Sequence, residues 1–361
     1  MSARTEAAPS RVGTWFEERL RISGLLAAML HVRIPVSAQT YYLGGITLFL
    51  FGVQLVSGTL LTLYYKPPAD AAYESVKYIT SVVEFGWLIR SVHHWGATLM
   101  IATVVLHLGR IFVQAAYKYP RELTWVVGVL LLAVTIGFGF TGYLLPWDQK
   151  AYWATTVGTE IAGGVPVIGD ALLYLLRGGA DVTDATLNRF FGMHVLVLPL
   201  LLGLLVVVHL TIVHQLGLAS PRHLEPRPER RGGPARPVEE PLKPFFPHYI
   251  LDEVIAWFVV LAALVVLASV LPAGREEEAD PLVTPPHIKP EWYFLSAYQL
   301  LKVVPRTIGI LVPVVAIGIL LLLPFLDRNP AVAKRRRPIA LSLAAVSVVV
   351  IVGLTVWGAQ S

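Results

Sequence analysis

The sequence predicts an all-α, multi-pass membrane protein with seven transmembrane helices. Of its 361 residues, 55% are hydrophobic and 15% are charged, whereas soluble domains usually carry about 25% charged residues. Seven apolar segments are long enough to cross a bilayer core, which takes about 20 helical residues. A backbone in lipid must satisfy its own hydrogen bonds, so these segments are expected to be helices. They lie at Tyr41–Tyr65, Ser91–Ala115, Thr124–Leu145, Gly192–His214, Leu251–Leu271, Ile308–Leu326 and Ile339–Trp357.

A polar, proline-rich stretch divides the spans into a group of four and a group of three. This composition is typical of an extended linker. The expected parts are a cytoplasmic segment with an interfacial helix (1–40), a four-span bundle (41–214), the linker (215–247) and a three-span C-terminal part (248–361). The long stretch 147–187 between spans three and four is expected to form short helices at the membrane surface.

Charge predicts the orientation of the spans. If the N-terminus is cytoplasmic, most of the 29 Lys and Arg residues fall on the cytoplasmic side, as the positive-inside rule requires. Seven spans then place the C-terminus outside. The basic residues flank membrane segments, which argues against nucleic acid as a partner. The chain has no cysteine, which excludes disulfides, thiolate zinc sites, cysteine-ligated iron–sulfur clusters and thioether-linked haem.

Four histidines inside the spans form two pairs at matched depths. His93 and His107 are fourteen residues apart in span two, about 21 Å of rise and 40° short of four turns. His194 and His209 are fifteen apart in span four, about 22 Å and 60° past four turns. Both spans run from outside to inside, so His93 is level with His194 and His107 with His209. Each level can supply two axial imidazoles to one planar metal macrocycle. The sequence therefore predicts two stacked haem sites, and the matched depths argue against four separate hydrogen-bonded core histidines.

Two arginines flank the predicted iron ligands. Arg90 precedes His93 by three residues and Arg110 follows His107 by three, a spacing that puts each pair on one side of the helix. We expect each arginine to bind haem propionates at its membrane face.

Glycines repeat the fourteen-residue spacing in the neighbouring spans. They are Gly44 and Gly58 in span one and Gly128 and Gly142 in span three. Glycine lets a flat porphyrin approach the backbone closely. Helix–helix packing by small residues is the alternative explanation.

Taken together, these features resemble cytochrome b of the quinol-oxidising cytochrome bc complexes, from about Thr40 to Trp357. The motifs that carry the resemblance are Arg90-Ser-Val-His-His-Trp, Gly142-Tyr-Leu-Leu-Pro-Trp-Asp-Gln, Arg189-Phe-Phe-Gly-Met-His and Pro290-Glu-Trp-Tyr-Phe. The resemblance implies two noncovalent b-type haems, a quinol/quinone substrate and a bacterial cytoplasmic membrane. It also implies a Rieske-type iron–sulfur protein and a c-type cytochrome or soluble acceptor as partners, lipid contacts and a homodimeric complex.

Several details distinguish two forms of that family. The fifteen-residue histidine spacing, the Pro-Trp-Asp-Gln motif and the lack of an eighth span resemble the photosynthetic form, here with its four-span and three-span subunits fused. Tyr298 and His214 resemble the respiratory form instead. Tyr42 stands where the photosynthetic form attaches an extra haem through cysteine, so no covalent haem is expected on this chain.

The mechanism that the resemblance implies is bifurcated quinol oxidation at an outer site. One electron leaves to the iron–sulfur protein and the other crosses through both haems to an inner quinone, with proton translocation. The resemblance implies that Glu291 is the general base, and its apolar, aromatic surroundings favour proton uptake by a carboxylate; a solvated loop carboxylate is the alternative reading. Tyr143, Tyr293 and Tyr298 are expected to line the same site, with membrane-interface aromatics as the alternative reading.

At the inner site the resemblance leaves a choice open. His214 is expected to face the inner quinone, and either Asp252 or Glu253 is expected to pass protons there. The sequence identifies neither the quinone nor the final acceptor. It also leaves two other readings: a membrane-anchor cytochrome b that links a dehydrogenase to quinone, and a haem-free transporter with a histidine proton relay.

Overall fold

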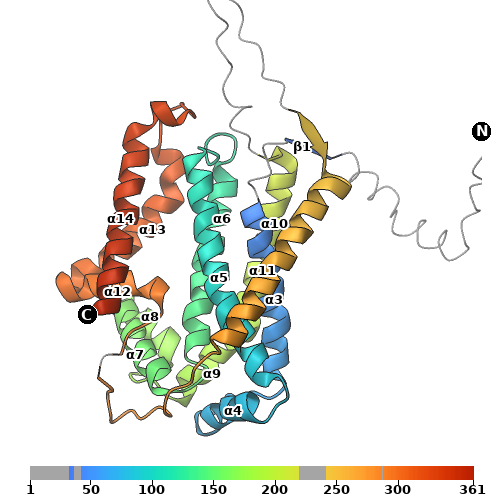
Figure 1. The fold of residues 1–361 in the computed structure, drawn as a ribbon. Coiled ribbons are helices and arrows are strands. Elements are labelled where there is room, and N and C mark those ends of the chain that lie inside the picture. Colours follow the sequence, from blue (N-terminus) through green and yellow to red (C-terminus); the bar gives the residue numbers. More distant parts are fainter. Residues whose placement is uncertain (1–31, 36–41, 219–240, 287) are drawn as a thin grey trace, which may run out of the picture.

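The computed structural model describes residues 32–35, 42–218, 241–286 and 288–361. Within these residues, seven helices are long and apolar enough to span a membrane, which confirms the predicted fold class (Figure 1). They are α3 (Tyr42–Thr62), α5 (Gly86–Val113), α6 (Glu122–Tyr143), the run Asp184–Leu216 that ends in α10 (Leu198–Leu216), the run Phe245–Val270 that ends in α11 (Ile250–Val270), α13 (Arg306–Leu326) and α14 (Pro338–Gln360).

Short helices gather at one end of the bundle (Figure 1). They are α4 (Ala69–Ser81), α7 (Gln149–Gly163), α8 (Gly169–Arg177) and α9 (Asp184–Gly192). Helices α7 and α8 lie wholly within the stretch 147–187, where short helices were expected, and α9 begins there and continues into the fourth span. We call this end, which the charge pattern predicts to face outside, the outer end, and the opposite end the inner end. A further helix, α12 (Trp292–Val303), lies beside α14.

The apolar core joins the two halves of the chain. Leu50 of α3, Met100 of α5, Leu202 of α10 and Leu264 of α11 are buried together in one cluster. Helix α11 packs against both α3 and α5, although it lies beyond the proline-rich stretch. The first helix of the C-terminal part is therefore an integral member of the histidine-bearing bundle.

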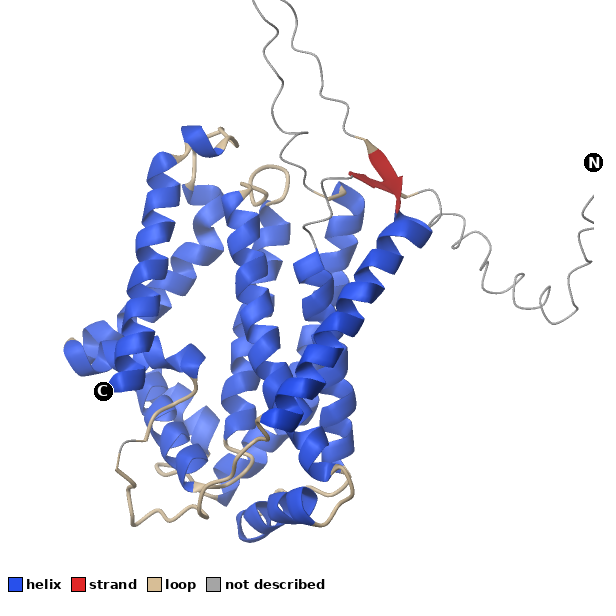
Figure 2. Ribbon diagram, in the orientation of Figure 1, coloured by secondary structure: helices blue, strands red, loops and turns tan. Residues whose placement is uncertain are grey.

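Two short strands lie at the inner end, where the sequence indicated none. Strand β1 (Arg33–Pro35) pairs antiparallel with β2 (Leu242–Pro244), and Ile34 faces Lys243 in the register (Figure 2). The pairing ties the segment before α3 to the end of the proline-rich stretch. The expected interfacial helix near the N-terminus and the centre of the expected linker (219–240) lie outside the described residues.

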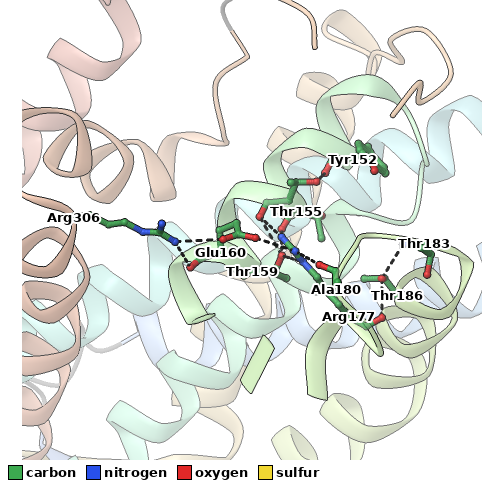
Figure 3. Close-up of polar contacts among 10 residues, drawn as sticks. Tyr152, Thr155, Thr159, Glu160, Arg177, Ala180, Thr183, Thr186 and Arg306 are labelled. Carbon is green, nitrogen blue, oxygen red and sulfur yellow. Dashed lines mark hydrogen bonds and ion pairs between the residues drawn. The ribbon is translucent and has the colours of Figure 1, made fainter. Parts of the chain in front are cut away.

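A buried arginine organises the short helices of the outer end (Figure 3). The Arg177 side chain donates from Nε to Thr159 Oγ1 at 2.7 Å and from Nη2 to the Thr156 carbonyl at 2.8 Å. Its Nη1 lies 3.0 Å from Glu160 Oε1, and Glu160 in turn pairs with Arg306 of α13 at 3.3 Å. A buried cation is tolerated only when its donors are satisfied, so this network fixes α8 on α7.

A second buried arginine holds two loops together at the inner end. Arg337 donates to the Phe112 carbonyl at 3.1 Å and to the Tyr117 hydroxyl at 3.0 Å. Tyr117 and Lys118 also bind Asp327, at the end of α13. Burial opposes ionisation of Asp327, but the hydrogen bonds from Tyr117 and Lys118 outweigh it and lower the pKa of that carboxyl. The loop before α14 is thus fastened to the end of α5.

Candidate haem and quinol sites

The outer histidine pair has the spacing of two ligands to one metal atom. His93 of α5 and His194 face each other with ring centroids 6.2 Å apart and an interplanar angle of 72°. A metal-bound imidazole nitrogen lies about 2 Å from the metal, so two imidazoles on opposite sides of one metal atom have centroids roughly 6 Å apart. The separation therefore fits one metal atom with a histidine on each side.

Two hydroxyl groups select the tautomer of these rings. Ser57 Oγ lies 2.9 Å from His93 Nδ1, and Thr141 Oγ1 lies 3.1 Å from His194 Nδ1. Each hydroxyl already donates its proton to a carbonyl of its own helix, Ser57 at 2.7 Å and Thr141 at 2.9 Å. The hydroxyl oxygens must therefore accept from Nδ1–H. This leaves both Nε2 atoms unprotonated, the form in which imidazole binds a metal.

Each of the four predicted glycines lies against one of the four histidines. A Cβ on Gly58 would lie 3.1 Å from His93 Cε1, and one on Gly142 would lie 2.5 Å from His194 Cε1. The same contact recurs at the inner level. There a Cβ on Gly44 would lie 3.2 Å from His107 Cε1, and one on Gly128 would lie 3.5 Å from His209 Cε1. The glycines thus make room for the imidazole rings themselves, whereas the sequence suggested room for a porphyrin.

A π-helical turn explains the unequal histidine spacings. Residues Met193–Val197 form this turn, in which the Leu198 N–H donates to the Met193 carbonyl five residues earlier. A π turn holds one more residue than the α turn that it replaces, and such turns are frequent at functional sites. The fifteen-residue interval from His194 to His209 is therefore equivalent to fourteen residues of α-helix. It matches the fourteen-residue interval from His93 to His107 in the continuous helix α5.

The inner pair comes together on the same two helices. His107 of α5 and His209 of α10 lie close enough to interact electrostatically, and Arg110 lies beside His107. Arg90, at the outer level, donates instead to the carbonyls of Ala273 and Gly274, at 2.7 Å each. Its expected contact with a propionate stays a prediction, because the structure uses both terminal nitrogens of Arg90 to hold the loop after α11.

Three of the expected quinol-site residues meet at the outer end. Glu291 is the N-cap residue of α12, and its neighbour Tyr293 lies against α6, where a Cβ on Gly139 would be 3.1 Å from the Tyr293 ring. Tyr143, at the end of α6, has a buried hydroxyl with no hydrogen-bond partner among the described residues. Burial raises the pKa of the Tyr293 phenol, and the nearby Glu291 adds to the effect. The Tyr293 phenol therefore keeps its proton and stays neutral beside Glu291.

Two outer residues were missed by the sequence analysis. Lys150, the second residue of α7, makes an ion pair with Glu291 at 3.0 Å. His94, which directly follows the predicted iron ligand His93, interacts with Glu291, Arg90 and Lys150. No local pattern indicated either role, because Lys150 and Glu291 are 141 residues apart in the chain.

The remaining expected residues take other positions. Tyr298 donates to the Ile288 carbonyl at 3.3 Å, within its own segment. His214 is exposed in the last turn of α10. Asp252 accepts from Lys243 at 2.9 Å and from Tyr42 at 3.2 Å.

Glu253 has a different environment from its neighbour Asp252. Its side chain fills the space over Gly45, so that a Cβ there would lie 1.7 Å from Glu253 Oε1. Gly45 directly follows Gly44, which contacts His107. Of the two carboxylates that the sequence left open, Glu253 is therefore the one that lies against α3 beside the glycine facing His107.

Comparison with known proteins agrees with this geometry. The family model described as cytochrome b/b6/petB matches residues 30–217, and the model described as cytochrome b (C-terminal)/b6/petD matches residues 278–361. The chain is 39% identical to a cytochrome bc complex cytochrome b subunit from Chlorobaculum thiosulfatiphilum, over 90% of this chain and 75% of that protein.

Two further matches, one in sequence and one in structure, agree with the same family. The chain is 35% identical over its full length to a cytochrome b/c1 protein of Bradyrhizobium diazoefficiens, of which it spans 52%. A solved structure, a hyperthermophilic respiratory Complex III, superposes with a TM-score of 0.83 at 35% identity, over 96% of this chain and 91% of that chain.

These matches weigh against the two other readings of the sequence, the dehydrogenase anchor and the haem-free transporter. The paired histidines, the two matching family models and a relative that is 39% identical over 90% of this chain lead to one conclusion. The chain belongs to the cytochrome b family and is the cytochrome b subunit of a bc-type complex.

Proposed function

We propose that the chain holds two noncovalent b-type haems and oxidises quinol at its outer end. His93 and His194 would bind the iron of the outer haem, and His107 and His209 that of the inner haem. The observation that carries this proposal is the outer pair, with its 6.2 Å centroid separation and both Nδ1 atoms engaged by hydroxyls. When bound, the two haems supply a one-electron relay between the two ends of the chain.

At the outer end, Glu291 would take a proton from the quinol. Its carboxylate lies at the start of α12, beside Tyr143 and Tyr293. The buried Tyr143 hydroxyl has no partner among the described residues, so it is available to hydrogen-bond a quinol oxygen. The rings of Tyr293 and Phe294, whose centroids are 4.7 Å apart, would exclude water from one side of the substrate.

At the inner end, Glu253 would deliver protons to a bound quinone, and His214 of α10 would face the same quinone. The support for choosing Glu253 is its position over Gly45, next to the glycine that contacts His107. Asp252 is instead engaged by Lys243 and Tyr42. Proton release outside and uptake inside would then couple quinol turnover to translocation.

The partners follow from the family. Because relatives of this chain are subunits of bc complexes, we propose a Rieske-type iron–sulfur protein and a c-type cytochrome, or a soluble acceptor, as electron acceptors. We also propose a homodimeric complex in a bacterial cytoplasmic membrane, with lipid around its apolar helices and the N-terminus on the cytoplasmic side.

Single histidine substitutions test the haem assignment. His93→Ala or His194→Ala should remove one b-type component from a potentiometric titration of the purified complex, and His107→Ala or His209→Ala should remove the other. If His107→Ala and His194→Ala remove the same component, the pairing proposed here is wrong.

A further inference from the structure

The ion pair between Lys150 and Glu291 connects two helices at the proposed quinol site. Lys150 Nζ lies 3.0 Å from Glu291 Oε1, and the two side chains are 33% and 20% exposed. The pair is thus partly shielded from water, where a charge interaction is screened less than on the open surface. It joins the start of α7 to the start of α12.

Neither the Glu291 side chain nor the Lys150 side chain stabilises the helix to which it belongs. Glu291 occupies the N-cap position of α12, yet its carboxylate accepts no hydrogen bond from the first turn of that helix. Lys150 stands in the first turn of α7, where the helix dipole disfavours a positive charge. Local helix formation therefore does not explain how the Glu291 and Lys150 side chains are oriented. The ion pair between them explains both orientations.

The surroundings of Glu291 contain few charged groups. Lys150 faces it from α7, His94 from α5 and Tyr143 from α6, while Tyr293 follows it on α12. Lys150 Nζ also lies 5.7 Å from the centroid of the Tyr143 ring. The lysine is therefore in contact with both the carboxylate and the aromatic ring of the proposed site.

We propose that Lys150 is a positioning residue for quinol oxidation: it holds one oxygen of the Glu291 carboxylate and leaves the other to accept the quinol proton. This proposal rests on the function proposed above for Glu291. In the step, the quinol O–H bond breaks and a new O–H bond forms on Glu291 Oε2, giving a quinol anion and a neutral carboxylic acid. Lys150 stays protonated. Once Glu291 is neutral, its attraction to Lys150 weakens and the acid is released to pass its proton to water.

The test compares variants of the intact complex, with duroquinol as substrate and rates expressed per haem. The variants are Lys150→Met, Lys150→Arg, Glu291→Gln, the double variant Lys150→Met/Glu291→Gln and the control Lys77→Met. Lys77 is a suitable control because it pairs with Glu74 on its own helix, α4, away from Glu291. Should Lys150→Met fail to assemble, Lys150→Gln replaces it with the same expectation.

The proposal predicts a specific pattern. Lys150→Met should lower kcat by roughly threefold to tenfold, because the carboxylate is no longer held in place, with KM little changed. Lys150→Arg keeps the positive charge and should lose less activity than Lys150→Met, whereas Lys77→Met should match the wild type. In the Glu291→Gln background, Lys150→Met should have no further effect.

Two results would overturn the proposal. One is an unchanged kcat in Lys150→Met, and the other is an equal loss of kcat from Lys150→Met in the presence and in the absence of the Glu291 carboxylate. Failure of the underlying function has a separate signature: Glu291→Gln would then oxidise duroquinol at the wild-type rate with both haems present.

Discussion

Deleting one residue from the π-helical turn should leave both haems in place. Leu196 lies in this turn and is 61% exposed, so its removal empties no core position. The deletion shortens the interval from His194 to His209 from fifteen to fourteen residues. If the π turn becomes an α turn, the two histidines keep their common face. We therefore expect two b-type haems per chain, as in the wild type.

The matched control is a deletion in the continuous helix α5. Val105 is 48% exposed and lies between His93 and His107, but α5 contains no π turn that could absorb its loss. Removing it rotates one histidine relative to the other by about 100° and shifts it by about 1.5 Å. At about 5 to 6 Å from the helix axis, that rotation moves the ring by about 8 to 9 Å. A metal–nitrogen bond of about 2 Å cannot follow such a movement, so one haem should be lost.

Haem content measures both outcomes. Pyridine haemochrome spectra give haem per chain, and a potentiometric titration counts the b-type components in the same preparation. The π turn is argued to compensate for the extra residue between His194 and His209. This argument would be refuted if deletion of Leu196 removed as much haem as deletion of Val105. Retention of both haems after deletion of Val105 would refute it equally.

Four further predictions follow from the same geometry. Gly142→Ala should lower the content of the outer haem, because a Cβ there would lie 2.5 Å from the ring of His194. The control is Gly137→Ala on the same helix, where the nearest neighbour of a Cβ is 3.9 Å away and no loss of haem is expected. Equal haem content in the two variants would contradict this reading. Glu291→Gln should slow quinol oxidation roughly tenfold to a hundredfold and leave both haem spectra intact, whereas wild-type turnover with an unchanged pH profile would reject Glu291 as the base. No haem should stay on the 39.6 kDa chain in a denaturing gel, since the chain lacks cysteine, and a peroxidase-stained band at that mass would contradict this. Asp327 has a lowered pKa in the folded protein, so its ionised form stabilises the inner loops above its unfolded pKa, and this stabilisation is lost as the pH falls through the folded value. Thermal unfolding followed from about pH 6 to about pH 3 should therefore depend less on pH in Asp327→Asn, and an unchanged dependence would count against the inner contact.

The seven spans and the four histidines could be predicted from the sequence because the bilayer limits the possible structures. Lipid requires continuous apolar helices, and a fixed rise of about 1.5 Å per residue turns sequence spacing into depth. The pairing of His93 with His194 and of His107 with His209 follows from that rule alone. The glycines were found by the same spacing, but their neighbours were not, because spacing does not show which atoms face each other across two helices.

The features that were missed depend on contacts between distant parts of the chain. Strands β1 and β2 are three residues each, too short for a periodic pattern, and their partners are separated by most of the bundle. The Lys150–Glu291 pair likewise joins segments that only the folded chain brings together. One missed feature did leave a signal: the fifteen-residue interval between His194 and His209, against fourteen elsewhere, is what the π turn accommodates.

The central claim is that four histidines hold two haems at two depths, and one measurement tests it most directly. A potentiometric titration of the purified complex, with haem extracted and quantified from the same sample, should show two b-type components and two acid-extractable haems per chain. A single component, or one haem per chain, would contradict the account.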